Sequence, residues 1–360
     1  MLRGRGRVSH GHPAGCLGKS TSYDPSRIAP RVALALLAVA SACAHHGDTI
    51  VTRSAPHMGT VVTLTVAARD ESTGVHAIER AFAEIARLEQ MLSSYRPASD
   101  LNRLNAQAGT GPVRVPRELS ELTFAAAAIA AQTAGAFNPL MGPAIKLWGI
   151  PHDPHVPSPG ELRALLPLIE LTGLGVRPKQ ATIALALPGM ALGLGGIAKG
   201  YTADRVVGLL QAEGMHGGVV EISGDVRTFG LGPGRRPWRV GVRDPRGSRA
   251  PLVVMEITDG AVSTSGDYER FFELEGVRYH HILDPRTLMP ARGLISVTVL
   301  APRAIDADAL ATAVLVMGAV EGLALVERSA GIEALLIDRD QQRLVSTGWP
   351  APIQSPAAAR

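Results

Sequence analysis

The middle of the chain carries the stretch Leu192-Gly-Leu-Gly-Gly-Ile-Ala-Lys-Gly200, shortly after residues that read as a strand. Glycines allow tight turns and a close approach of the backbone to a ligand, and a lysine adds a positive charge. The combination favours a loop that holds phosphate. A P-loop is excluded because Lys199 is followed by Gly200 rather than by Ser or Thr. A dinucleotide fingerprint is half met, but no βαβ series surrounds the loop.

The first 43 residues differ in composition from the rest and are expected to form an export leader. A basic segment rich in Gly and Pro precedes a short apolar run, residues 32–40, which suits a signal peptide and is too short to span a bilayer. Small residues precede Cys43, as in bacterial lipoproteins, although Ala40 stands where Leu or Val is usual. The alternatives are an ordinary signal cleaved near Ala42 or Ala44, or a disordered tail. Both kinds of signal predict an exported protein, periplasmic or on the outer face of the cell membrane, and the first adds a lipid anchor at Cys43.

Charge and cysteine content support setting the leader aside. Residues 1–42 carry a net charge of +5 and the whole chain carries +4, so the remainder is close to −1. The high isoelectric point therefore belongs to the leader and gives no argument for a nucleic-acid partner. Cys16 would be lost with the leader and Cys43 would be lipidated, which leaves no thiol for a disulfide or a metal site. The apolar core must then hold the fold.

The rest of the chain is expected to form one continuous domain over residues 50–345, followed by a flexible tail at 346–360. Alternation of β-branched residues predicts a strand over 57–66, and apolar residues at helical spacing predict a helix over 74–92. Further helices are expected at about 118–134, 159–167, 198–213, 306–317 and 319–329, and strands at about 181–187, 217–222, 237–242, 252–257, 277–283, 294–300 and 331–337. This mixture predicts an α+β fold with mostly antiparallel sheets, flanking helices and two intertwined lobes.

Seven short motifs, the glycine loop among them, occur in a fixed order. They are Met58-Gly-Thr60, Ser93-Ser-Tyr95, Gly135-Ala-Phe137, Gly195-Gly-Ile-Ala-Lys-Gly200, Ser265-Gly-Asp-Tyr268, His280-His-Ile-Leu-Asp-Pro285 and Asp308-Ala-Leu-Ala-Thr312. With these motifs the chain resembles the ApbE family of FAD:protein FMN transferases over about residues 54–338. The resemblance implies an exported enzyme that binds FAD and Mg²⁺. Such an enzyme moves FMN onto a Ser or Thr of an acceptor redox protein as a phosphoester and releases AMP.

Asp308 and Thr312 are the candidate metal ligands. They stand four residues apart at the head of an apolar helix, so they share one face of it. A carboxylate and a hydroxyl suit Mg²⁺, which keeps places for water and phosphate. The resemblance adds the backbone carbonyl of Gly196 as a third ligand. The structural alternatives are a helix-start carboxylate for Asp308 and a hydroxyl bonded to its own helix for Thr312.

Lys199 and one histidine are the candidate catalytic residues. Lys199 is expected to lie against the pyrophosphate of FAD and to stabilise developing negative charge there. His281, or failing that His280, is the candidate base for the acceptor hydroxyl, since imidazole titrates near neutral pH. Neighbouring residues of a strand point to opposite faces, so only one of the two can face the site. Asp284 is a candidate for orienting that histidine.

The remaining FAD contacts depend on the resemblance. It implies a binding set of Met58, Tyr95, Ala136, Phe137, Asn138, Gly193, Lys199 and Ile282. Met58 and Tyr95 would pack against the flavin or the adenine.

The chain departs from the family pattern at three positions. Gly193 and Asn138 stand where the family usually has Asp, and Ser223 stands where it has a Gly. With two carboxylates missing from the cleft, two alternatives to transfer stay open. One is an FAD pyrophosphatase, in which water replaces the acceptor hydroxyl and the products are FMN and AMP. The other is an FAD-binding lipoprotein without catalysis.

Overall fold

The computed structural model describes residues 49–248 and 250–351. The predicted leader, with Cys43, lies outside these residues, so the signal and lipid-anchor predictions stay predictions. The described residues form one compact unit. No helix within the described ranges is both long enough and apolar enough to cross a bilayer.

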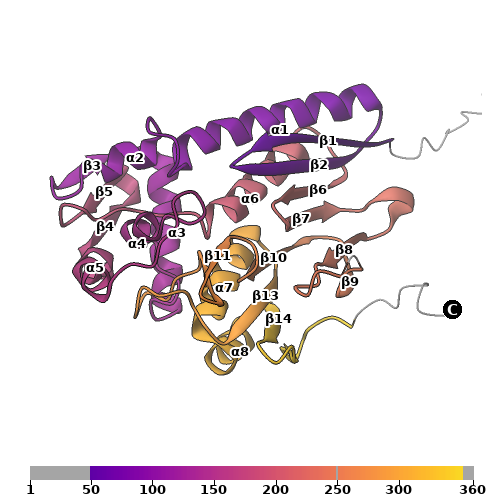
Figure 1. The fold of residues 1–360 in the computed structure, drawn as a ribbon. Coiled ribbons are helices and arrows are strands. Elements are labelled where there is room, and N and C mark those ends of the chain that lie inside the picture. The colour runs from indigo at the N-terminus through magenta and orange to yellow at the C-terminus, as the bar shows by residue number, and fades with distance from the viewer. Residues whose placement is uncertain (1–48, 249, 352–360) are drawn as a thin grey trace, which may run out of the picture. The chain divides into compact units, whose positions relative to one another are not determined.

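An antiparallel sheet of eight strands is the largest element of the fold (Figure 1). Its strands alternate buried and more exposed residues; in β2, for example, Val62, Leu64 and Val66 are fully buried. In spatial order the strands are β1 (Thr49–His57), β2 (Thr60–Ala68), β6 (Gly217–Ile222), β7 (Asp225–Gly230), β10 (Gly260–Gly266), β13 (Leu294–Ala301), β14 (Glu333–Asp338) and β15 (Arg343–Val345).

The predicted strand over residues 57–66 is wrong at its start, because it contains a hairpin turn. β1 ends at His57, and β2 begins at Thr60, its register partner. Met58 and Gly59 between them have φ angles of 53° and 71°. Positive φ at both central positions is typical of the two-residue turns that join twisted strands. The sequence pattern hides this turn because Met rarely takes a positive φ.

Helices pack on one face of the large sheet and bury the first apolar core against it. The helices of the fold are α1 (Glu71–Leu92), α2 (Asp100–Asn105), α3 (Arg117–Gln132), α4 (Gly142–Trp148), α5 (Pro159–Leu165), α6 (Ala198–Ala212), α7 (Ala304–Met317) and α8 (Ala319–Glu327). Parts of α1, α6, α7 and α8 line this core.

A separate hairpin, β8 (Trp238–Val242) and β9 (Val253–Ile257), covers the other face of the large sheet. Alternate residues of β14 show this: Leu335 and Ile337 pack in the apolar cluster of the hairpin, whereas Ala334 and Leu336 pack in the core on the helical side.

A second core lies around a three-stranded sheet and the helices α2 to α5. The sheet has the order β3 (Pro112–Arg114), β5 (Thr182–Leu185), β4 (Leu174–Arg177), and the two-stranded hairpin of β11 (Phe271–Leu274) and β12 (Val277–His280) contributes Phe272 and Tyr279. Short 3₁₀ turns complete the region, at Leu166–Ile169, Leu171–Gly173 and Pro178–Gln180, and another lies at Pro233–Arg235.

The two cores share helices. In α1, Ile78 and Ile85 enter the first core while Leu88 and Met91 enter the second. In α7, Leu310 enters the first core and Ala309 enters the second, so this helix is apolar on nearly every face. The predicted α+β fold with two intertwined lobes is confirmed, and the loop that ends at Gly200 lies at their junction, with Leu194 and Ile197 in the second core and Ala203 in the first.

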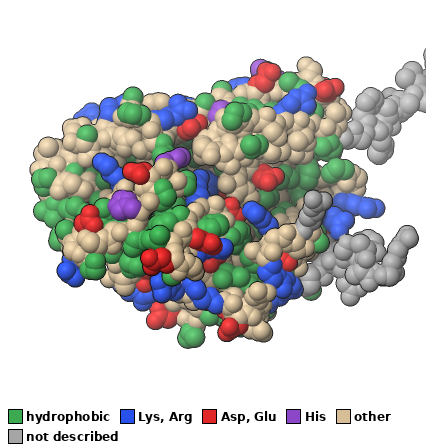
Figure 2. Space-filling view, viewed as in Figure 1, with side chains coloured by type: hydrophobic (Ala, Val, Ile, Leu, Met, Phe, Trp, Pro, Cys, Tyr) green, Lys and Arg blue, Asp and Glu red, His purple; other side chains and the backbone are tan. Residues whose placement is uncertain are grey.

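The fold continues past the predicted boundary at residue 345. Ser346 is buried, and its hydroxyl accepts a hydrogen bond from the backbone of Ala334. Trp349 packs against the β8–β9 cluster. Residues 352–360 lie outside the described part of the chain. On the face in Figure 2, positive and negative side chains are interspersed over most of the surface.

Candidate active site

Lys199 lies between two carboxylates that come from different elements. It is the second residue of α6, and its Nζ is 2.6 Å from Oδ2 of Asp225 and 2.9 Å from Oδ1 of Asp308. Asp225 begins β7 and Asp308 lies in α7. Both carboxylates are almost fully buried, while Lys199 keeps 27% of its side chain exposed. These three side chains, the Lys199 cluster, form a polar site within an apolar junction.

Backbone and hydroxyl groups hold the two carboxylates in place. The backbone N–H of Gly200 donates to Oδ2 of Asp308 over 3.0 Å. The hydroxyl of Ser263 and the backbone N–H of Thr264 donate to Oδ1 of Asp225. Oδ2 of Asp225 is close to Lys199 but has no hydrogen bond of suitable direction, so its interaction with the ammonium is ionic.

The two carboxylates keep Lys199 positively charged and leave the Lys199 cluster with room for a further cation. Burial by itself would lower the pKa of Lys199, but the carboxylates of Asp225 and Asp308 outweigh it and raise the pKa above its usual range. The partial exposure of Lys199 weakens the burial effect further, so the amine is charged at neutral pH. Burial raises the pKa of Asp225 to about 6, with Lys199 opposing this rise and Asp308 adding to it. With both carboxylates ionised, the cluster carries one net negative charge, which a further cation would neutralise.

Thr312 and Gly196 meet beside Asp308. The Thr312 hydroxyl donates to the backbone carbonyl of Asp308 over 3.3 Å and lies 3.4 Å from the Ser265 hydroxyl. A Cβ built on Gly196 would lie 3.2 Å from the same Thr312 oxygen. The structure thus brings together all three residues predicted as metal ligands.

The residues at this position fit a Mg²⁺ ion in their chemistry. The available donors are a carboxylate, hydroxyls and a backbone carbonyl, the hard oxygen ligands that Mg²⁺ takes. Lys199 and Gly200 each use one lone pair of the Asp308 carboxylate, which leaves two of about four. No group of three or more His, Cys, Asp and Glu side chains suited to a metal occurs in the described residues. A site with one carboxylate, one hydroxyl and one carbonyl does not depend on such a group.

The two neighbouring histidines differ in whether a ring nitrogen is free to accept a proton. His280 is buried; its Nδ1 accepts from the backbone of Ile282, so its Nε2 carries the proton and donates to the carbonyl of Ala291 over 2.8 Å. His281 is only partly buried, and its Nδ1 lies 3.2 Å from the carbonyl of Arg270. A carbonyl only accepts, so Nδ1 of His281 carries a proton and Nε2 keeps a lone pair. His281 therefore has the tautomer of a general base.

Burial, the charge of Arg270 and, more weakly, that of Lys199 together lower the pKa of His281 to about 4. Its imidazole is therefore neutral at pH 7 and able to accept a proton. Asp284 does not orient it: its carboxylate instead accepts several hydrogen bonds from Arg286. The carbonyl of Arg270 takes the orienting position that the sequence suggested for Asp284.

Several residues predicted to contact FAD lie near the junction of the cores. Phe137 is buried, and its ring lies 3.4 Å from a Cβ built on Gly196. Met58, at the hairpin turn, packs against both main cores. Ala136 and Ile282 pack with the first core, Ala136 at its edge and Ile282 within it.

Three others have different surroundings. The Asn138 side chain is used within the protein, since it donates to the carbonyl of Ile169 and accepts from the backbone of Leu140. Gly193 lies against the start of α4, where a Cβ would be 3.2 Å from the backbone nitrogen of Gly142. Tyr95 is 62% exposed, and its aromatic contact within the described residues is with His152.

The sequence analysis assigned no role in the site to Asp225 or to its partner Ser263. One signal was available: Asp225 is a carboxylate next to an apolar strand segment, and carboxylates are rarely buried unless they are paired. Two surface recesses, of about 440 and 600 Å³, are lined by other residues, around His216 and around His76. The site is therefore located by its polar groups and not by either recess.

Comparisons with known proteins identify the family of this chain. A profile of the ApbE family matches residues 58–336. The chain is 41% identical over 308 residues to a FAD:protein FMN transferase of Treponema pallidum, covering 81% of this chain and 85% of the relative. It is 34% identical over 297 residues to one of Klebsiella pneumoniae, covering 82% and 91%.

Solved structures give the same result. The crystal structure of an ApbE protein of Thermotoga maritima has a TM-score of 0.78 and 34% identity, covering 83% of this chain and 97% of that one. The apo form of the flavinyl transferase ApbE of Pseudomonas stutzeri has a TM-score of 0.74 and 32% identity, covering 84% and 96%. Because the profile spans most of the chain and the relatives cover it with substantial identity, this chain belongs to the ApbE family.

Proposed function

We propose that this chain is a Mg²⁺-dependent FAD:protein FMN transferase, which moves FMN from FAD onto a Ser or Thr of an acceptor redox protein and releases AMP. The relatives above carry that activity in their names. The observation that supports it most is the Lys199 cluster, which places a lysine between two buried carboxylates beside Thr312 and Gly196. This is a site for a cation and a polyphosphate.

The chain's own residues would act as follows. The Lys199 ammonium binds the pyrophosphate and offsets the negative charge that develops as the bond between the FMN phosphorus and the bridging oxygen breaks. Nε2 of His281 takes the proton of the acceptor hydroxyl, whose oxygen forms the new bond to the phosphorus of FMN. The bridging oxygen leaves with AMP. Asp308, Thr312 and the Gly196 carbonyl would hold Mg²⁺, which supplies further charge compensation at the phosphates.

One incubation tests this proposal against its alternatives. The purified chain is mixed with FAD, Mg²⁺ and a flavin-free redox protein that carries FMN on Ser or Thr in its mature form. Flavin that stays on the acceptor after denaturation, with AMP in equal amount, is the expected result. FMN and AMP free in solution would instead assign an FAD pyrophosphatase, and unchanged FAD would assign a binder without catalysis.

Export to the periplasm or to the outer face of the cell membrane, with a lipid on Cys43, is part of the same proposal. It is supported by the apolar run at residues 32–40 and the small residues before Cys43. Labelling cells with a radioactive fatty acid should mark the wild-type chain and not a Cys43→Ser variant. A labelled Cys43→Ser chain, or an unlabelled wild-type chain, would exclude the anchor.

A further inference from the structure

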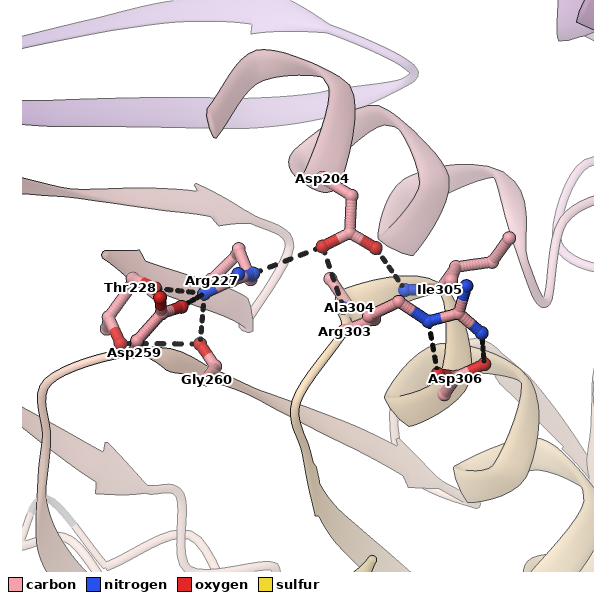
Figure 3. Close-up of polar contacts among 9 residues, drawn as sticks. All are labelled: Asp204, Arg227, Thr228, Asp259, Gly260, Arg303, Ala304, Ile305 and Asp306. Atoms are coloured by element: carbon pink, nitrogen blue, oxygen red, sulfur yellow. Dashed lines mark hydrogen bonds and ion pairs between the residues drawn. The ribbon is translucent and has the colours of Figure 1, made fainter. Parts of the chain in front are cut away.

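Asp204 lies in the middle of α6, yet its carboxylate serves the start of another helix. Its Oδ1 accepts a hydrogen bond from the backbone N–H of Ala304 over 3.0 Å, and its Oδ2 accepts one from Ile305 over 2.9 Å (Figure 3). These are the first residues of α7, whose own N-cap residue, Arg303, makes no side-chain capping bond. The first N–H groups of a helix lack partners within it, so Asp204 caps α7 from outside.

Arg227 joins a third element to this cap. It lies on β7, and its Nε donates to Oδ1 of Asp204 over 3.1 Å. Its Nη1 donates to the Asp259 carboxylate and to the carbonyl of Gly260 (Figure 3). The Arg227 side chain is only 12% exposed. In such a place an ion pair with several hydrogen bonds is held more firmly than one on the surface.

The three elements that this pair connects are those that carry the Lys199 cluster. Lys199 lies on α6, Asp225 lies on β7, and Asp308 lies on α7. Arg227 and Asp225 are two residues apart on one strand, and Ala304 and Asp308 are one turn apart in α7, so a small shift at the cap carries over to the cluster.

The two helices also approach closely at this point. A Cβ built on Gly200 would lie 2.1 Å from the carbonyl oxygen of Ala304, the residue that Asp204 caps. The backbone N–H of Gly200 reaches the Asp308 carboxylate only because α6 and α7 are this close.

We propose that Asp204 and Arg227 are positioning residues for the Lys199 cluster. They hold the start of α7 against α6 and β7, so that the Asp308 carboxylate stays within bonding distance of Lys199 and Gly200 and in place for a cation. Neither residue contacts the reacting groups. The metal readout below depends on the proposed function, whereas the geometric readout does not.

A neighbouring pair provides a matched control. Arg303 and Asp306 lie at the same helix start and form two hydrogen bonds of 2.7 Å (Figure 3). This pair is local to α7 and its cap, and Arg303 is 67% exposed. Asp306→Asn therefore removes a helix-start carboxylate without breaking a link between elements. A purely stabilising role for Asp204 predicts similar effects of Asp204→Asn and Asp306→Asn once both variants are folded.

The test compares Asp204→Asn, Arg227→Gln and Asp306→Asn in the full chain, below the unfolding temperature of each. Binding of Mn²⁺, as a paramagnetic substitute for Mg²⁺, is followed by electron paramagnetic resonance. We expect at least about a tenfold higher dissociation constant in Asp204→Asn, since groups that support metal ligands usually matter by that factor. Arg227→Gln should also bind less tightly, and Asp306→Asn should match the wild type. Arg227→Gln keeps the cap, so it carries the test if Asp204→Asn does not fold. Wild-type affinity in both positioning variants, or an equal loss in Asp306→Asn, would overturn the proposal.

A crystal structure of a positioning variant separates this inference from the proposed function. If the wild-type chain binds no Mn²⁺, the metal assignment fails, but the positioning role still predicts that the distance between the Gly200 nitrogen and the Asp308 carboxylate exceeds 3.0 Å in Asp204→Asn. An unchanged distance in Asp204→Asn, or in Arg227→Gln if the first variant does not fold, would refute the positioning role.

Discussion

The Lys199 ammonium lies 2.6 Å from a buried carboxylate oxygen of Asp225. A second carboxylate, that of Asp308, lies on its other side, so the cluster holds two negative charges and one positive charge. Because Lys199 neutralises only one of the two carboxylates, Asp225 does more than form an ion pair with Lys199. Under the proposed function, it supplies the excess negative charge that a bound metal cation and Lys199 would share.

Replacing Asp225 by Asn tests that role. The variant keeps a side-chain oxygen that can accept from Ser263, and Lys199 keeps Asp308 as a partner, so the free energy of unfolding should fall by no more than about 2 kcal/mol. The negative charge is lost, however, and Mg²⁺ should bind more weakly. Isothermal titration with Mg²⁺ and urea denaturation measure the two effects. Unchanged Mg²⁺ affinity in a stable Asp225→Asn chain would exclude Asp225 from the charge balance of the site.

His281→Ala should lose transfer activity by about 10²–10⁴-fold, the usual contribution of a general base. FAD binding should change little, because the free Nε2 acts on the acceptor hydroxyl. Rates of acceptor labelling and FAD affinity by fluorescence quenching give the comparison. His280 is the control: both of its ring nitrogens are bonded to the backbone, so His280→Ala should lower stability more than it lowers the rate in the folded fraction. A larger loss of rate in the folded His280→Ala chain than in His281→Ala would assign the general base to His280 instead.

The pH dependence follows from the direction of two pKa shifts. His281 acts as a base when neutral, and its pKa is lowered to about 4, so its effect on the rate is lost only as the pH falls through about 4. Asp225 has a pKa raised to about 6 in the metal-free cluster, so its protonation should weaken cation binding, and at subsaturating Mg²⁺ a decrease in rate near pH 6 belongs to Asp225. That step should be absent in Asp225→Asn, whose rate should stay flat from about pH 7.5 to about 5.5. A step near pH 6.5 that persists in Asp225→Asn would show that His281 titrates like a free histidine.

Gly200→Ala tests the close contact of α6 with α7. The added Cβ would lie 2.1 Å from the carbonyl oxygen of Ala304, so the helices must separate, and we expect a loss of about 1–3 kcal/mol in the free energy of unfolding. Gly208 lies in the same helix with no atom within 4 Å of a built Cβ. Gly208→Ala should therefore stabilise the chain by about 0.5–1 kcal/mol, as Gly to Ala does inside a helix. Urea denaturation of both variants measures the difference, and equal values would contradict the contact.

The sequence predicted the helices of the fold better than its strands. Helices α1, α6 and α7 have long apolar patterns, and their ends lie within a few residues of the predicted ones. Strand β7 was not predicted because it begins at the buried Asp225, and β10 was not predicted because Ser263, Thr264 and Ser265 interrupt its apolar pattern. The Ser263 hydroxyl bonds to Asp225 and the Ser265 hydroxyl lies beside Thr312, so these two polar side chains serve the site and not the core.

The candidate site was predictable where its residues are close in sequence. Asp308 and Thr312 follow from helical spacing, and the Gly196–Lys199 loop follows from its glycines. The cap that Asp204 gives to α7 bridges about a hundred residues, and no local pattern encodes it. The orientation of His281 likewise depends on the carbonyl of Arg270, which folding brings to it across a hairpin.

Mass spectrometry of the acceptor protein, after incubation with the purified chain, FAD and Mg²⁺, is the most direct test of the proposed chemistry. The proposed function predicts a mass increase of one FMN less one water on a Ser or Thr of the acceptor, and no increase with Asp308→Ala. An acceptor of unchanged mass with the wild-type chain, or full modification with Asp308→Ala, would contradict it.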